Sequence, residues 1–238
     1  MFLAAGAIAF GAGCLARSWY ERDCLVTEEY RIVSEKIHGP EKTIVFLTDL
    51  HNKEFGDQNC RLLDAVQKVK PDVVLSGGDG MVAKKGNSDV EIPRKLLTEL
   101  AKEFPVYCGN GNHECRMVWK SDIYGAAYEN YRAALENAGI RYLANGSADL
   151  DGEIRIYGLD LPKSAYLPRS GQIPENLLKD ALGEPDPGRF NLLLAHSPLF
   201  FGSGSYALRT FSRRHDLASG PRRSHDPSVS VFLSALCG

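Results

Sequence analysis

Aspartate, histidine and asparagine side chains are concentrated in four short motifs of this chain. The motifs are Asp49-Leu-His51, Gly78-Asp79, Gly111-Asn112-His113-Glu114 and Ala195-His196-Ser197. Carboxylate and amide oxygens bind hard divalent cations, and imidazole nitrogens bind transition metals. Together these residue types predict a two-metal site of the kind that catalyses phosphoryl transfer.

Each motif also has a simpler interpretation when it is taken alone. Asp49 and His51 are compatible with a solvated loop turn, and Asp79 with a turn among glycines. The pair Asn112 and His113 is compatible with a surface turn, and His196 with a hydrogen-bonded core histidine. Their shared placement after apolar segments favours metal ligation over these separate alternatives.

The apolar segments before the motifs predict buried strands, and helices alternate with them. Continuous apolar runs are typical of strands that are covered on both faces, and apolar spacing of three and four residues indicates amphipathic helices. The predicted strands are residues 30–33, 43–48, 72–76, 105–108, 141–143, 154–157 and 190–194, and the predicted helices are 58–70, 92–104 and 123–138. This alternation predicts a layered α/β domain.

In order, spacing and strand-end placement, the four motifs resemble those of the calcineurin-like metallophosphoesterases. The resemblance covers residues 43–200. It implies a four-layer α/β/β/α sandwich that holds two divalent metal ions such as Mn, Fe or Zn. An apolar segment before the domain is similar to the bacterial, membrane-associated branch of the family.

The resemblance also implies a role for each metal ligand. Asp49 and His51 would bind the first metal, and Asn112 and His196 would bind the second. Asp79 would bridge both.

The same resemblance implies a hydrolase of phosphate mono- or diesters. His113 would protonate the leaving oxygen, with Glu114 beside it as an orienting group. A hydroxide bridging the metals would attack phosphorus in line, while both metals neutralise the developing charge. We expect the substrate to be a small or lipid-linked phosphate ester.

The last motif of the family, Gly-His-x-His-Gly-Gly, does not occur in this chain. Only His215 and His225 follow His196, and neither has the expected glycines or preceding apolar strand. Possible codons for Ser212 to Asp216, read one nucleotide later, permit His-Gly-Gly-Thr-Ile. We therefore hypothesise that residues 201–238 are an out-of-frame tail, which leaves the sandwich incomplete at its C-terminus and its activity impaired. The competing hypothesis is an inactive remnant or a membrane-attached binding module.

The N-terminal residues differ in composition from the rest of the chain. Residues 1–16 carry no charge, and Arg17, Trp19, Tyr20 and Arg22 follow them. This pattern is typical of a membrane anchor with interfacial flanks, although the run is shorter than a full span. A cleaved signal peptide, a trimmed anchor and a buried helix are the alternatives. We expect a membrane-associated protein with a cytoplasmic catalytic domain, divided into residues 1–22, a strand and linker at 23–42, the domain at 43–200 and the tail.

Composition restricts the partners of the chain. The formal net charge of its 238 residues is −2, and no basic tract interrupts the domain. Nucleic-acid surfaces are usually strongly basic, so a nuclease is disfavoured. The six cysteines form no CxxC pair, which favours reduced thiols and a reducing compartment.

Overall fold

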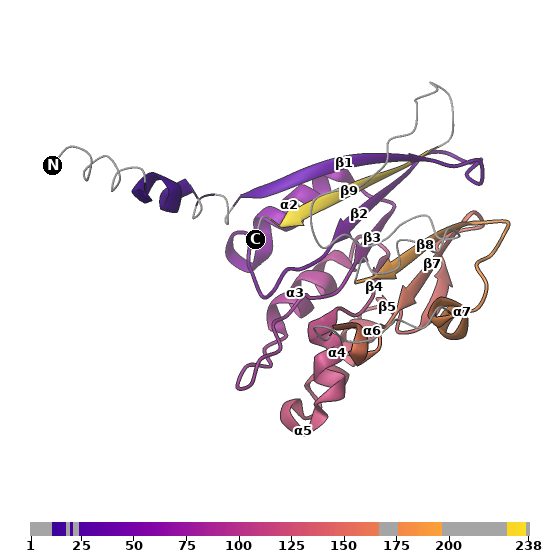
Figure 1. The fold of residues 1–238 in the computed structure, drawn as a ribbon. Helices are drawn as coiled ribbons and strands as arrows, with labels where there is room; N and C mark the ends of the chain where they lie inside the picture. The colour runs from indigo at the N-terminus through magenta and orange to yellow at the C-terminus, as the bar shows by residue number, and fades with distance from the viewer. Residues whose placement is uncertain (1–10, 18–19, 21–23, 167–175, 197–227, 237–238) are drawn as a thin grey trace.

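The computed structural model describes residues 11–17, 20, 24–166, 176–196 and 228–236 (Figure 1). It contains a six-stranded sheet in the order β1-β9-β2-β3-β4-β5 and a three-stranded sheet in the order β6-β7-β8. The strands are β1 (Leu25–Val33), β2 (Lys42–Leu47), β3 (Val73–Ser76), β4 (Val106–Cys108), β5 (Arg141–Tyr142), β6 (Gly146–Asp149), β7 (Ile154–Leu159), β8 (Phe190–Ala195) and β9 (Ser228–Leu236). Strands β9, β2, β3, β4 and β5 run parallel to one another, as do β7 and β8.

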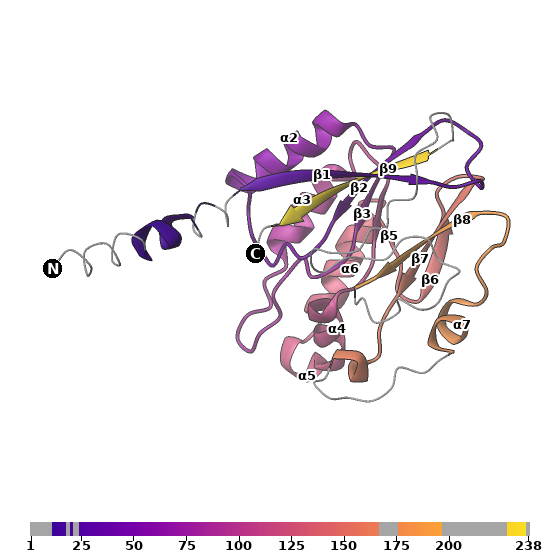
Figure 2. The same ribbon diagram turned by 45° about the horizontal axis from the view of Figure 1, so that its top comes forward.

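The helices complete four layers. They are α2 (Cys60–Val69), α3 (Glu91–Leu100), α4 (Asn112–Trp119), α5 (Ser121–Tyr124), α6 (Ala127–Asn137) and α7 (Leu177–Leu182), with 3-10 turns η1 (Asp57–Asn59) and η2 (Lys163–Tyr166). Helices α2, α3 and α6 cover one face of the large sheet, the small sheet lies against its other face, and α7 packs outside the small sheet (Figure 2). The predicted α/β/β/α sandwich is therefore confirmed.

Strand β2 shows why the buried residues of a central strand are apolar on both faces of the sheet. Val45 and Leu47 face the helices, whereas Ile44 and Phe46 face the small sheet. Successive side chains of a strand point to opposite faces, so a strand covered on both sides needs apolar residues at every position.

Several predicted elements need correction. The predicted helix 92–104 ends at Leu100, and the predicted helix 123–138 divides into α5 and α6. Helices α4 and α7 and strands β6 and β9 were not predicted, and β9 lies within residues 201–238, the predicted out-of-frame tail. The largest consequence concerns α4, because Asn112 and His113 begin a helix rather than lying in a loop.

The structure tests the N-terminal prediction only in part. Residues 11–17 are helical and exposed. Among the described residues, no helix combines the length and the apolarity needed to cross a membrane. Residues 1–10 lie outside the described ranges.

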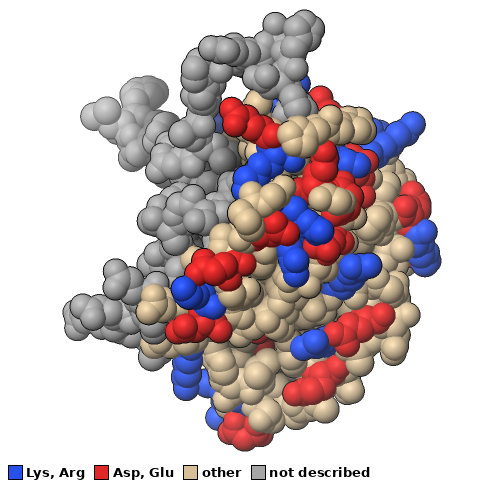
Figure 3. All heavy atoms as spheres, turned by 90° about the vertical axis from the view of Figure 1, so that its right-hand side faces the viewer, with Lys and Arg blue, Asp and Glu red and all other residues tan. Residues whose placement is uncertain are grey.

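Charges of both signs are mixed on the side of the molecule that lies to the right in Figure 1. Figure 3 shows lysine and arginine interspersed with aspartate and glutamate there, without a continuous basic area. Ion pairs join Arg189 to Asp149 (2.6 Å) and Lys42 to Asp151 (3.5 Å) at the amino-terminal ends of β8 and β2. The described residues on this face therefore form no continuous basic surface.

Candidate metal centre

The loops that carry the predicted ligands begin at the carboxyl ends of β2, β3, β4 and β8. The loops after β2 and β3 are joined through their backbones: the N–H of Asp49 donates to the carbonyl of Gly78 (3.1 Å), and that of His51 to the carbonyl of Asp79 (3.0 Å). Asp49, His51 and Asp79 all have left-handed backbones, with φ of 56°, 51° and 53°. Such conformations cost about 1 kcal/mol or more at non-glycine residues, so these loops are held in place by their neighbours.

Two glycines allow the loops after β3 and β4 to touch. A Cβ atom on Gly78, whose φ is +90°, would lie 2.1 Å from the backbone nitrogen of Gly111. A Cβ on Gly111 would lie 2.3 Å from Oδ1 of Asp79. Both positions therefore require glycine.

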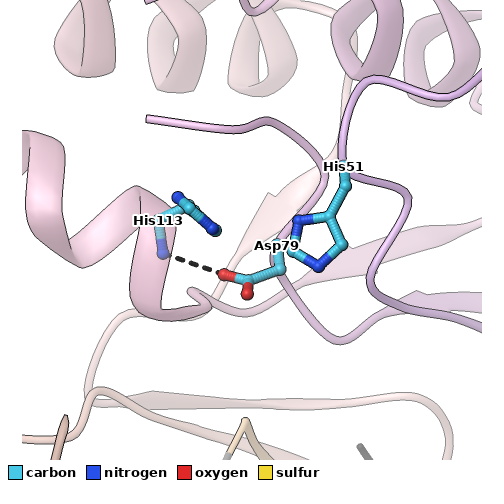
Figure 4. A group of neighbouring side chains, drawn as sticks. All are labelled: His51, Asp79 and His113. Atoms are coloured by element: carbon cyan, nitrogen blue, oxygen red, sulfur yellow. Dashed lines mark hydrogen bonds between the residues drawn. The ribbon is translucent and has the colours of Figure 1, made fainter. Parts of the chain in front are cut away.

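Asp79 lies at the centre of the site and is almost fully buried. Its Oδ1 accepts the backbone N–H of His113 (2.8 Å), and its Oδ2 lies 3.1 Å from Nε2 of His196. Burial alone would raise the pKa of Asp79, but the hydrogen bonds to His196 and from the His113 backbone lower it overall. Figure 4 shows the side chains of His51 and His113 on either side of this carboxylate.

His196 is the ligand candidate that the small sheet contributes, because it directly follows β8. Its Nδ1 lies 3.1 Å from the carbonyl of Gly77, which fixes the hydrogen on Nδ1 and turns Nε2 toward Asp79. Burial alone would lower the pKa of His196, but the hydrogen bond to Asp79 and the charges of Asp79, Asp49 and Glu114 raise it to about 9. His196 is thus held as a ligand would be, with one nitrogen anchored and the other directed at a carboxylate.

Asp49 and His51 lie together at the more exposed side of the site. Nε2 of His51 is 3.6 Å from Oδ1 of Asp49, and Nε2 of His196 is 3.9 Å from the same oxygen. The Asp49 carboxylate raises the pKa of His51 against the effect of burial, with a further contribution from Asp79. Thr48 donates its hydroxyl hydrogen to Oδ2 of Asp49 (2.9 Å), which orients that carboxylate.

The amide of Asn112 lies beside Asp79. In one orientation its nitrogen donates to Oδ2 of Asp79 (3.0 Å) and its oxygen accepts the backbone N–H of His113 (3.1 Å). With the amide turned over, its oxygen faces the carboxylate oxygen, and a cation shared by the two oxygens would stabilise that arrangement. Asn112 is therefore in place to supply a neutral oxygen ligand next to Asp79.

His113 is fixed by a backbone contact that the sequence does not reveal. Its Nδ1 accepts the N–H of Ala83 (3.0 Å), so the neutral ring holds its hydrogen on Nε2. Burial lowers the pKa of His113; Asp79 opposes the shift, and Arg116 and His51 add to it. Its ring meets that of His51 edge-on, with 5.3 Å between centroids. The hydrogen on Nε2 is thus left for another acceptor, and the proton-donor role of His113 stays a prediction.

Glu114 lies beneath the site and is almost fully buried. Its carboxylate accepts the backbone N–H groups of Asp79 (2.8 Å), Gly80 (3.0 Å) and Gly111 (3.0 Å). Burial, followed by the charge of Asp79, raises the pKa of Glu114 to about 7, against the effect of these hydrogen bonds. These contacts tie the loops after β3 and β4 together, and the predicted orienting role beside His113 stays a prediction.

The donor set fits divalent metal ions. Ligand atoms of Asp49, Asp79 and His196 lie within 4.8 Å of one another, and so do those of His51, Asp79 and His113. Asp79 belongs to both groups, as a bridging carboxylate would. The division of ligands between two metals stays a prediction. His215 and His225, the remaining candidates for lost ligands, lie outside the described residues.

The family comparison agrees with this geometry. The model of the calcineurin-like phosphoesterases matches residues 42–221, which is most of the chain. A comparison with curated proteins gave no match. Members of this family normally bind divalent metals, and the matched residues contain both groups of candidate metal ligands. On the family match and on the four-layer fold, this chain belongs to the calcineurin-like phosphoesterase family.

Proposed function

We propose that this chain hydrolyses phosphate mono- or diesters at a two-metal site. The ligands would be Asp49, His51, Asp79, Asn112 and His196. The observation that carries the proposal is the convergence of Asp49, Asp79 and His196 within 4.8 Å, although they come from three strand ends in two different sheets. The carboxylates of Asp49 and Asp79 repel one another at this distance, and a divalent cation between them would offset that repulsion.

Bound divalent ions would supply charge neutralisation for the transferred phosphoryl group and an activated water. The chain's own contribution is to orient the groups around them. Gly77 fixes the tautomer of His196, and Ala83 fixes that of His113. His113 would donate a hydrogen bond from Nε2 to the leaving oxygen and so favour its departure.

Hydrolysis of p-nitrophenyl phosphate and bis-p-nitrophenyl phosphate with added Mn²⁺ tests the proposal. Asp79→Asn should abolish Mn²⁺-dependent turnover of both esters. Asp186→Asn is the matched control, because Asp186 lies at the opposite end of β8 from His196 and pairs with Arg189. Turnover that persists in Asp79→Asn would exclude this site, and Mn²⁺ binding without turnover of any ester would favour a binding module.

The role of His113 is tested by changing the leaving group. His113→Ala should slow hydrolysis by about 10²-fold or more. The loss should be larger for phenyl phosphate than for p-nitrophenyl phosphate, because the poorer leaving group depends more on a donor. Equal losses with both esters would remove His113 from this role.

We also propose that the activity of this chain is impaired. The sequence lacks the Gly-His-x-His-Gly-Gly motif, so each metal would lack one imidazole. Reduced metal content after Mn²⁺ loading and slow turnover are the expected results, and two tightly bound metals with fast turnover would contradict them. The nucleotide sequence that encodes residues 205–216 tests the frameshift directly, because the motif must appear in the next frame.

The N-terminal composition supports attachment to a membrane, with the catalytic domain on the cytoplasmic side. Residues 1–16 are uncharged, and Arg17 and Arg22 follow them. A lipid-linked phosphate ester would then be within reach of the site. Flotation of the full chain with liposomes, compared with a chain that begins at residue 23, tests this attachment; equal flotation of the two would contradict it.

A further inference from the structure

A buried polar cluster adjoins the metal centre but contains none of its predicted ligands. Its centre is Asn110, which follows β4 and directly precedes Gly111. The amide nitrogen of Asn110 lies 3.0 and 2.9 Å from the two carboxylate oxygens of Asp160. The hydroxyl of Tyr128 lies 3.0 Å from this nitrogen, and the amide oxygen accepts the hydroxyl hydrogens of Tyr128 (3.2 Å) and Tyr142 (2.5 Å).

The cluster joins the two sheets at the edge where the metal centre lies. Asp160 follows β7 in the small sheet, whereas Asn110 follows β4 in the large one. Tyr142 comes from β5 and Tyr128 from α6. The position of the Asn110 side chain is therefore set by four elements at once.

The neighbouring backbone tolerates little displacement. Gly111 is so close to Asp79 that a Cβ on it would lie 2.3 Å from Oδ1 of Asp79. Two residues further along, the backbone N–H of His113 donates to that same oxygen (2.8 Å). One peptide bond separates Asn110 from Gly111. A shift of Asn110 would therefore move Asn112 and His113 relative to Asp79, and displacements of about 1 Å are enough to reduce catalysis strongly.

We propose that Asp160 is a positioning residue that acts through Asn110 on the segment carrying Asn112 and His113. This inference rests on the proposed function. Asp160 does not belong to either group of candidate metal ligands. Its two oxygens accept from the Asn110 amide and hold it against the large sheet.

A carboxylate suits this role better than an amide would. Both oxygens of Asp160 face the Asn110 nitrogen, whereas an asparagine would offer one oxygen and place an NH₂ group against another NH₂ group. Hydrogen bonds to a charged acceptor are also about twice as strong as neutral ones. Burial raises the pKa of Asp160, and the hydrogen bond from Asn110 and the charge of Arg132 offset this cost of a buried carboxylate only in part.

The test compares Asp160→Asn, Asn110→Ala and the double variant with the wild-type full chain. The control is Asp186→Asn, a carboxylate-to-amide change at the opposite end of the small sheet. Mn²⁺ affinity is measured by calorimetry, and kcat and KM with p-nitrophenyl phosphate. Asp160→Asn should weaken Mn²⁺ binding and lower kcat about tenfold each, with KM little changed. The double variant should be no worse than Asn110→Ala, because both changes break one connection.

A third measurement does not depend on metal. In the metal-free protein, amide hydrogen exchange in residues 111–117 should be faster in Asp160→Asn than in wild type or Asp186→Asn. A lower melting temperature with unchanged Mn²⁺ affinity, kcat and exchange would overturn the positioning role and leave the proposed function standing. If the wild-type chain neither binds Mn²⁺ nor hydrolyses the ester, the proposed function fails, and exchange at 111–117 alone decides whether Asp160 positions this segment.

Discussion

Metal binding should expel a proton from His196 at neutral pH. Asp79, 3.1 Å away, holds the pKa of His196 at about 9, so nearly every ring is protonated at pH 7.5 in the metal-free protein. A metal ligand must be neutral, so binding would release about one proton per chain from this residue, whereas a histidine with the reference pKa of about 6.5 would release about one tenth. Apparent affinity should therefore rise as pH rises toward 9.

Calorimetric titration with Mn²⁺ at pH 7.5, in buffers with different ionisation enthalpies, measures the number of protons released. His196→Gln should lower that number by about one, which separates His196 from His51, whose pKa is also raised. A release of about one tenth of a proton, or a release that His196→Gln leaves unchanged, would refute the reasoning.

The same pair makes the stability of the metal-free protein depend on pH. The folded pKa of His196 lies above the unfolded value, so the protonated pair stabilises the fold fully below about pH 6.5, and this contribution is lost as pH rises through about 9. The shift corresponds to about 3 kcal/mol. Urea unfolding of the metal-free protein should show the decline, and His196→Gln should remove it.

Three further predictions concern the framework of the site and are measured by urea unfolding. Gly78→Ala should lower the free energy of unfolding by at least about 2 kcal/mol, because the new Cβ would lie 2.1 Å from the Gly111 nitrogen. The control Gly86→Ala, whose Cβ would have nothing within 4 Å, should lower it by about 1 kcal/mol, and equal losses would contradict the close approach. Glu114→Ala should cost about 3 kcal/mol or more, since it leaves two buried N–H groups and one half-buried N–H group without their acceptor. A loss below about 1 kcal/mol would show that water replaces the carboxylate. Leu75→Ala should cost about 2–5 kcal/mol, because Leu75 is fully buried between the sheets, and a smaller loss would mean that the sheets close over the gap.

The central strands and the clustering of the motifs were predictable from sequence for one physical reason. Strands covered on both faces are apolar at most positions, so the apolar runs 44–47, 73–75 and 192–195 of β2, β3 and β8 stand out in the chain. Parallel strands end at the same edge, which brings the polar residues after them together. Helix α4 was missed because its buried residues, Glu114, Cys115 and Met117, give little apolar periodicity.

Other contacts at the site leave no trace in a single sequence. The N–H of Ala83 that faces His113 and the carbonyl of Gly77 that faces His196 are backbone groups, which every residue type possesses. The pairing of Asn110 with Asp160 depends on how the two sheets stack, and their separation in sequence conceals it. The one available signal was position in the chain. Asp160, like Asp49 and Asp79, lies within three residues of the end of an apolar strand.

The place of β9 in the large sheet has a consequence for synthesis of the chain. Strand β1 is joined to the sheet through β9, with Leu25 opposite Leu236 and Val33 opposite Ser228. β1 is therefore paired with a strand that is synthesised after β2 to β8. Until β9 has been made, the pairing seen here between β1 and β9 cannot form, and the edge of β2 that β9 covers stays open as a template for wrong pairing. A growing chain would depend on prompt synthesis of β9, or on a chaperone that covers that edge, to avoid aggregation.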